Sequence, residues 1–208
     1  MEYLVALGIA FGFSFVGMLP PGMLNMTVIG LSMKKGFKVA LFFAIGAAIV
    51  EFFQSLLVIK FADSAQSFLD EYELYVNWTA VVILIALGLS FLFTKQKKEN
   101  IEEKKVEGNA MSALVKGITL AFANVLVYAF WLVQGIYWTQ KGVLYNEWPI
   151  LITFSFGIFL GSVAAYVVYI LLGEKILSKF DSFARNLNKI LAGIFFLLAA
   201  LQLSQIIF

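Results

Sequence analysis

The chain contains no cysteine and no histidine among its 208 residues. These absences exclude disulfide exchange, thiolate or imidazole ligation of a metal, and a nucleophile activated by histidine. We therefore expect no catalytic residues, no metal site and no cofactor. Charge is also scarce, because Asp, Glu, Lys and Arg together make up 13% of the chain. A soluble domain usually has about twice that share, so a water-exposed surface of ordinary size is not expected.

Hydrophobic residues, by contrast, make up 62% of the chain and gather in continuous runs of about 20 residues. Runs of that length and without alternation predict membrane-spanning helices rather than barrel strands. The first run is too long for one straight span, and Pro20, Pro21 and Gly22 in its middle predict that it is broken. We predict an all-α integral membrane protein with six spans: 3–33, 37–59, 76–94, 113–138, 148–172 and 190–208.

Lysine and arginine are concentrated in the first, third and fifth loops between these spans. Basic loops stay on the cytoplasmic side, so both termini are expected outside. Because three is an odd number, two successive three-helix units must cross the membrane in opposite senses, which is the geometry of an inverted repeat. We assign residues 1–94 to the first repeat, 95–110 to a charged cytoplasmic linker and 111–208 to the second repeat.

The predicted break in the first span is a candidate binding site. Two prolines remove two amide donors, so the carbonyls of Val16 and Gly17 should lose their helical partners and suit a cation or ammonium group. The helix that restarts near Gly22 and Asn25 should direct free amides towards a carboxylate. Irregular backbone at membrane depth is tolerated only inside protein or beside a wet cavity. The alternative is a kink at Pro21 that only improves packing.

Glu51 is a second candidate, because it is the only ionisable residue deep in any predicted span. A charge there costs about 2.5–3.5 kcal/mol on insertion scales, so Glu51 should face the interior. Gln54 lies on the same helix face, which is otherwise small and polar. Glu51 either binds a substrate ammonium group, carries a proton, or does both. The alternative is a protonated acid in a structural hydrogen bond between helices.

The fourth and fifth spans carry further candidates. Asn124, Tyr128 and Trp131 form one helical stripe that could line a substrate path, although aromatic stripes are as often packing. Ser162 lies on a polar face of the fifth span, next to a GxxxG motif. That motif allows close helix contact within the chain or, alternatively, between two chains of a homodimer.

The order of these motifs resembles the LysE/RhtB-type amino-acid exporter family. The resemblance runs over nearly the whole chain. The matching segments are Pro21 to Asn25, Lys34-Lys35-Gly36, Gly46 with Val50-Glu51, Asn124 with Phe130-Trp131, Gly157 to Ser162, and Asn188 to Gly193. Three residues depart from the family pattern. Met23 replaces a second proline, Glu51 replaces an aspartate, and Val125 replaces the proline after Asn124, so we expect the fourth helix to be straighter than in relatives.

The resemblance implies a secondary transporter of the bacterial cytoplasmic membrane. Its expected cargo is an amino acid or a related small polar metabolite, exported in exchange for protons. The internal correspondence of the halves pairs Pro21–Asn25 with Asn124, and Glu51 with Ser162, so the site is expected where these four helices meet. The alternatives are an ion or small-solute channel and a non-transporting membrane assembly protein. No feature of the sequence suggests a nucleic-acid partner.

Overall fold

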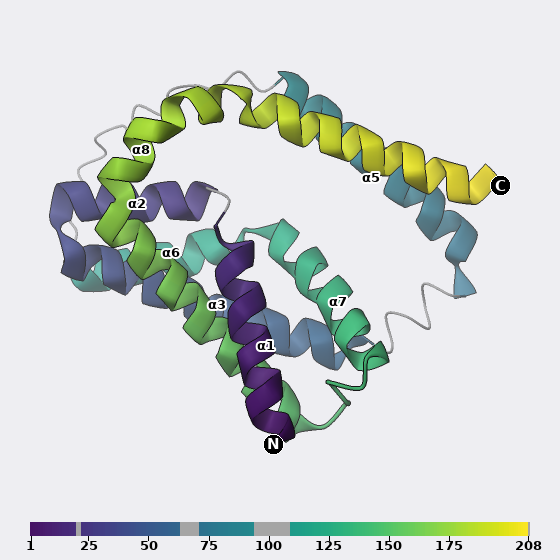
Figure 1. The fold of residues 1–208 in the computed structure, drawn as a ribbon, viewed down its shortest axis with the longest axis horizontal. Helices are drawn as coiled ribbons and strands as arrows, with labels where there is room; N and C mark the ends of the chain where they lie inside the picture. Colours follow the sequence, from purple (N-terminus) through teal and green to yellow (C-terminus); the bar gives the residue numbers. More distant parts are fainter. Residues whose placement is uncertain (20–21, 63–70, 94–108, 208) are drawn as a thin grey trace. The chain divides into compact units, whose positions relative to one another are not determined.

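The structure is a computed structural model that describes residues 1–19, 22–62, 71–93 and 109–207. All regular structure in these ranges is helical, as predicted (Figure 1). The helices are α1 (Glu2–Gly17), α2 (Met23–Lys35), α3 (Phe37–Lys60), α5 (Glu73–Phe93), α6 (Ala110–Phe122), α7 (Val125–Gln140) and α8 (Trp148–Ile207).

The chain divides into two compact units, and each unit takes helices from both halves of the sequence. The first comprises Met1–Ser64 and Lys104–Glu174, which contain α1, α2, α3, α6, α7 and the first part of α8. The second comprises Ala65–Glu103 and Lys175–Phe208, which contain α5 and the rest of α8. Within the second unit the ring of Phe196 packs against Gly88, where an added Cβ would lie 2.8 Å from it.

Glycines allow the helix backbones of the first unit to touch. A Cβ added at Gly46 in α3 would lie 2.3 Å from the carbonyl oxygen of Leu114 in α6. The same addition at Gly161 in α8 would lie 2.4 Å from the carbonyl oxygen of Phe11 in α1. Real side chains do not approach so closely, so these positions require glycine. Helix α3 therefore packs directly on α6, and α8 packs directly on α1.

The predicted break in the first span is present, because α1 ends at Gly17 and α2 begins at Met23. Pro20 and Pro21 lie outside the described residues. The Val16 carbonyl is not left free as the sequence suggested, since the Leu19 amide donates to it at 3.1 Å in a tightened last turn. The next carbonyls are satisfied by side chains: Asn25 Nδ2 donates to Met18 at 2.9 Å, and the Tyr169 hydroxyl donates to Leu19.

The fourth span is also broken, although Val125 stands where the family pattern has a proline. The expectation that this helix is straighter than in relatives stays a prediction. Helices α6 and α7 meet at 65° around Asn124. Gln54 of α3 donates to the Ala121 carbonyl at 3.1 Å, and the Tyr128 hydroxyl lies 3.4 Å from the Phe122 carbonyl. The Ala121 carbonyl also accepts from the Asn124 amide at 3.0 Å, so Gln54 adds a second donor to the last turn of α6, and this break forms without a proline.

The predicted fifth loop is helical, so the separation of spans 148–172 and 190–208 by a loop is wrong. Helix α8 runs without interruption from Trp148 to Ile207. Residues 173–189 contain no proline, and their Lys, Glu, Leu and Arg residues are good helix formers. Basic residues predict a place outside the lipid, but they do not predict a loop. The chain does turn between α2 and α3, where Gly36 adopts φ +86°, a conformation that favours glycine.

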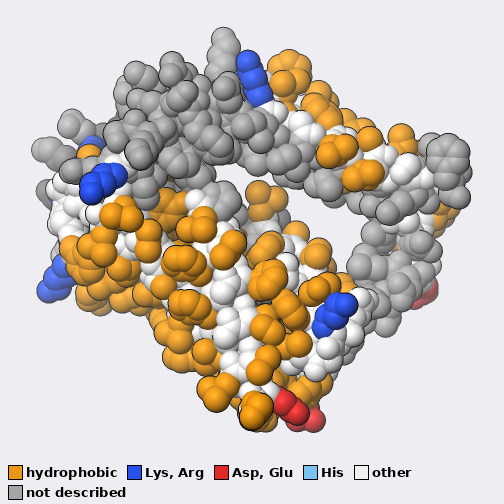
Figure 2. All heavy atoms as spheres, viewed as in Figure 1, with side chains coloured by type: hydrophobic (Ala, Val, Ile, Leu, Met, Phe, Trp, Pro, Cys, Tyr) orange, Lys and Arg blue, Asp and Glu red, His pale blue; other side chains and the backbone are white. Residues whose placement is uncertain are grey.

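Two described helical segments are long and apolar enough to cross a membrane, namely Phe37–Lys60 and Trp148–Gly173. The bent pair of α6 and α7 makes a third if it counts as one span. The two helices of the first predicted span are each too short alone. Apolar side chains cover the visible face of the first unit, and charged side chains lie at its edges (Figure 2). The six spans and the inverted repeat stay predictions, and most of the predicted linker 95–110 lies outside the described residues.

Candidate functional site

Glu51, in the middle of α3, hydrogen-bonds to side chains from two other helices. The indole Nε1 of Trp131 in α7 donates to carboxyl oxygen Oε1 at 3.3 Å. The hydroxyl of Ser162 in α8 is hydrogen-bonded to the other oxygen, Oε2. Trp131 and Ser162 are buried, whereas Glu51 keeps a partly exposed surface. The structure therefore brings together three residues that the sequence singled out.

A residue that the sequence analysis missed extends this contact. The Ser14 hydroxyl in α1 lies 2.8 Å from the Ser162 hydroxyl and donates to the Ile158 carbonyl at 3.0 Å. We call Ser14, Ser162 and Glu51 the hydroxyl chain. The available signal was that Ser14 is the only serine or threonine in residues 1–17. Nothing in the local sequence shows that it faces α8.

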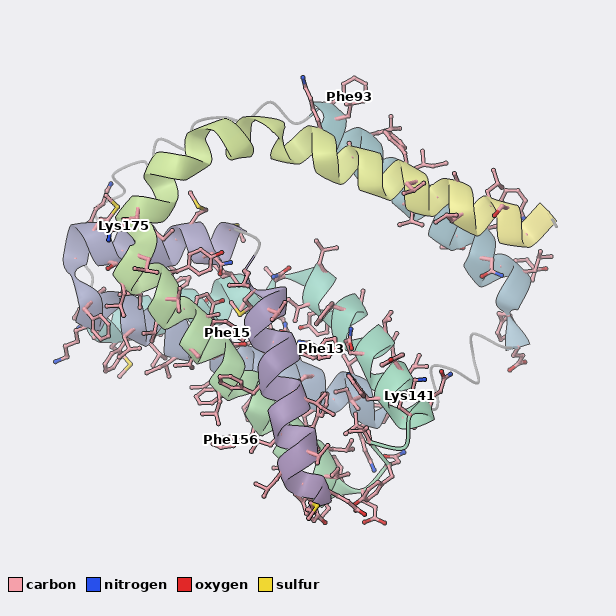
Figure 3. The ribbon with its side chains drawn as sticks, in the orientation of Figure 1. Phe13, Phe15, Phe93, Lys141, Phe156 and Lys175 are labelled. Carbon is pink, nitrogen blue, oxygen red and sulfur yellow. The ribbon has the colours of Figure 1, made fainter. Side chains whose placement is uncertain are left out.

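The surroundings of the hydroxyl chain are aromatic and tightly packed. The Trp131 ring is 1% exposed and meets the ring of Phe154 edge-on, with centroids 6.4 Å apart. The phenol of Tyr166 in α8 is equally buried and interacts electrostatically with Glu51. On α1, Phe13 (labelled in Figure 3) packs edge-on against Trp138 of α7 at 5.3 Å. The contact with Phe154 and the burial of Trp131 restrain the ring that donates to the Glu51 carboxyl group.

The other predicted site residues surround the two helix breaks instead. Asn25 contacts Met18 and the Tyr169 hydroxyl at the first break. Gln54 and Tyr128 donate to carbonyls at the second break, where Asn124 is the residue between α6 and α7. Among the described residues, no hydrogen bond joins Asn25, Asn124, Gln54 or Tyr128 to Glu51.

The three remaining predicted site residues lie at the first break. Gly17 ends α1, and a Cβ added there would meet the Phe130 ring at 3.6 Å, an ordinary contact. Gly22 is exposed and precedes the first residue of α2 in an extended conformation. Pro21 lies outside the described residues. The predicted site thus separates into one acidic centre and two capped breaks.

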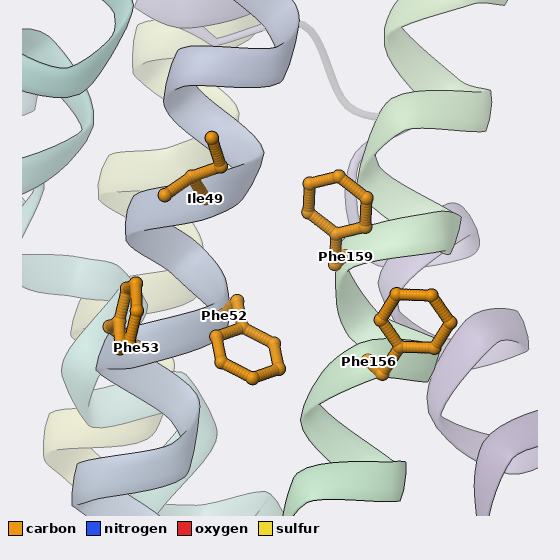
Figure 4. A pocket seen from close by; sticks show the side chains of 5 residues that line it. All are labelled: Ile49, Phe52, Phe53, Phe156 and Phe159. Atoms are coloured by element: carbon orange, nitrogen blue, oxygen red, sulfur yellow. The ribbon is translucent and has the colours of Figure 1, made fainter.

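The described part of the chain also holds a pocket that Glu51 does not line. A pocket of about 220 Å³ lies between α3 and α8, lined by Ile49, Phe52, Phe53, Phe156 and Phe159 (Figure 4). Its walls offer no hydrogen-bond donor or acceptor, so it suits a hydrocarbon chain and not a polar solute. Glu51 lies in the middle of an apolar helix, and its carboxyl group can exchange a proton or bind a cation there.

A comparison with known protein families finds a match that covers most of the helices described above. A sequence model of the LysE type translocator family matches residues 15–205, from the end of α1 to the end of α8. The chain belongs to that family. The translocator is therefore a membrane transporter, and the resemblance seen in its sequence motifs is confirmed. No curated protein and no solved structure gives a significant match.

Proposed function

We propose that this translocator is a secondary exporter of amino acids or related small polar metabolites, driven by exchange with protons across the bacterial cytoplasmic membrane. The observation that carries the proposal is the environment of Glu51. One carboxyl group in the middle of an apolar helix contacts Trp131 and Ser162, both from the second half of the chain. Intramembrane carboxyl groups usually mark ion or substrate pathways.

Two sets of reciprocal contacts support an inverted repeat. Helix α3 packs on α6 at Gly46, and α8 packs on α1 at Gly157 and Gly161. Helix α3 also caps the break after α6 through Gln54, and α8 caps the break after α1 through Tyr169. Each half thus supplies its second span to the broken first span of the other half, as a two-fold exchange requires. Glu51 follows Gly46 by five residues, and Ser162 follows Gly157 by five.

Competition at Glu51 gives the exchange its mechanism. A single carboxylate in a medium of low dielectric constant compensates one cation, either a proton or the ammonium group of a substrate. Protonation on the outer side therefore displaces the substrate, and loss of the proton on the inner side allows the next substrate to bind. Both termini are proposed to lie outside, and the partners are the solute, protons and the lipid bilayer.

The test is efflux of radiolabelled amino acids from proteoliposomes that contain the purified translocator, with and without an imposed pH gradient. We expect efflux of at least one class of amino acid, faster when the acceptor side is acidic. An efflux rate that does not change with the pH gradient and does not saturate with amino-acid concentration would indicate a channel instead. No efflux of any amino acid or related metabolite would favour the assembly-protein alternative.

A further inference from the structure

The hydroxyl chain contains one more contact than its serines can supply with hydrogens. Three oxygen pairs are in hydrogen-bonding contact: Glu51 with Ser162, Ser162 with Ser14, and Ser14 with the Ile158 carbonyl. A serine hydroxyl has one hydrogen, so Ser14 and Ser162 provide two. The carbonyl provides none. If each of the three contacts holds a hydrogen of its own, the third hydrogen comes from the Glu51 carboxyl group.

We infer that Glu51 is protonated in this conformation and that Ser14 and Ser162 form a latch between α1 and α8 that closes only on the protonated acid. In the closed latch Glu51 donates to Ser162, Ser162 donates to Ser14, and Ser14 donates to Ile158. The carboxyl oxygen without the proton is then Oε1, which accepts the indole hydrogen of Trp131. Each contact of the hydroxyl chain then has one donor and one acceptor, as buried polar groups require.

When Glu51 is ionised, the hydroxyl chain has one hydrogen fewer than it has contacts. The Glu51 carboxylate accepts the hydrogen of Ser162, and the single hydrogen of Ser14 is left for both Ser162 and the Ile158 carbonyl. One contact between α1 and α8 then brings two oxygens together without a hydrogen between them. Those helices touch closely beside Gly161, where an added Cβ would also lie 2.9 Å from Ser14 Cβ. Loss of one proton therefore weakens the α1–α8 contact at its only hydroxyl pair among the described residues.

The charged groups around Glu51 agree with a neutral acid. In the described part of the chain Glu51 has no ion pair, and the phenol of Tyr166 is its titratable neighbour. The charged residues of the helices that surround it are Glu2 on α1, Lys34 and Lys35 on α2, Lys38 and Lys60 on α3, and Lys116 on α6. On α8 the charged residues begin at Glu174, twelve residues beyond Ser162 and so about 18 Å further along the helix. Lys60, the nearest along α3, is nine residues and so about 13 Å away.

This inference rests on the proposed proton exchange at Glu51, and it makes Ser14 a positioning residue for that step. Its test needs neither substrate nor gradient, so its failure is separate from a failure of transport. Infrared spectroscopy of the purified protein detects the C=O stretch of a protonated carboxyl group, assigned to Glu51 by its loss in Glu51→Gln. Because the chain has no cysteine, spin labels at Leu4→Cys and Phe156→Cys, both exposed, report the α1–α8 distance.

We expect the wild-type band at neutral pH, and a longer or broader label distance once the band disappears at high pH. Glu51→Gln, whose amide can still donate to Ser162, should keep the short distance at every pH. Ser14→Ala should lose part of the band at neutral pH and show the longer distance throughout, because Ser162 then donates to Glu51. Ser155→Ala is the control, since the Ser155 hydroxyl, on α8 like that of Ser162, is buried and has no partner among the described residues.

Two results would overturn the inference. One is a wild-type protein with no Glu51 band at neutral pH. The other is a label distance that does not change with pH, or that changes equally in wild type and Glu51→Gln. If Ser14→Ala does not fold, Ser162→Ala interrupts the hydroxyl chain at its central residue instead. The label distance should then no longer change with pH, as expected for Ser14→Ala.

Discussion

Both carboxyl oxygens of Glu51 are hydrogen-bonded to residues from the other half of the chain, Trp131 and Ser162. We predict that Glu51→Gln inserts and folds normally yet loses efflux driven by a pH gradient, because the amide keeps the hydrogen bonds but cannot exchange a proton. Efflux from proteoliposomes with equal protein content measures this. A Gln variant with unchanged rate and pH dependence would make Glu51 structural.

Glu51→Asp provides the matched comparison. The shorter side chain keeps an exchangeable proton but cannot reach Trp131 and Ser162 together without a shift of α3. We expect partial efflux with its pH dependence retained.

At this scale the sequence predicted part of the site. Glu51 was found because one deep acid is conspicuous, and Ser162 because it occupies the matching place in the second half. Ser14 was not found, because the register between two packed helices depends on the glycines at their contact, which carry no sign of their partner. Asn25 and Gln54 were predicted as binding residues because they are polar and deep, but their bonds satisfy backbone carbonyls.

Among the elements, the two broken helices differ in how their carbonyls are satisfied. The buried Tyr169 hydroxyl hydrogen-bonds to Leu19, whereas the Tyr128 contact with Phe122 is long at 3.4 Å. Tyr169→Phe should lower the free energy of unfolding by about 1 kcal/mol, the usual net value of one hydrogen bond. Tyr128→Phe should cost less than half of that. Thermal unfolding in detergent measures both, and equal losses would contradict this ranking of the caps.

The first break was predictable and the second was not. Pro20 and Pro21 remove amide donors, so their effect can be deduced from the sequence alone. At the bend around Asn124 the Ala121 carbonyl accepts a hydrogen bond from Gln54, which is 70 residues away from Asn124 and reaches Ala121 only when α3 is packed on α6. Tertiary contacts of this kind are not encoded in local propensity.

The contact between α1 and α8 gives a second prediction at this scale. Gly161→Ala would place a methyl group 2.4 Å from the Phe11 carbonyl oxygen, which is backbone and cannot turn aside. We expect a loss of about 1–3 kcal/mol in unfolding free energy, as for other overpacked contacts. Gly12→Ala in α1 is the control, because an added Cβ there meets nothing within 4 Å and alanine favours helix. A Gly161 variant as stable as the Gly12 variant would show that the helices are not in contact.

For the whole molecule, the basic loops predict the orientation in the membrane. Single cysteines at Glu2 and Gln140 should react with an impermeant thiol reagent added to intact cells, and one at Lys35 should react only after lysis. The wild-type chain has no cysteine, so it serves as the unlabelled control. The opposite labelling pattern would reverse the orientation, and equal labelling at all three sites would contradict the predicted crossings.

The hydroxyl chain ends at the Ile158 carbonyl, and a peptide carbonyl has no proton to pass on. A hydrogen ion that reaches Glu51 from its exposed side therefore has no onward route through Ser162 and Ser14. It has to leave by the side chain that received it, after the helices have rearranged. Under the proposed exchange, a translocator without substrate would therefore not let protons leak across the membrane through this chain of hydroxyl groups.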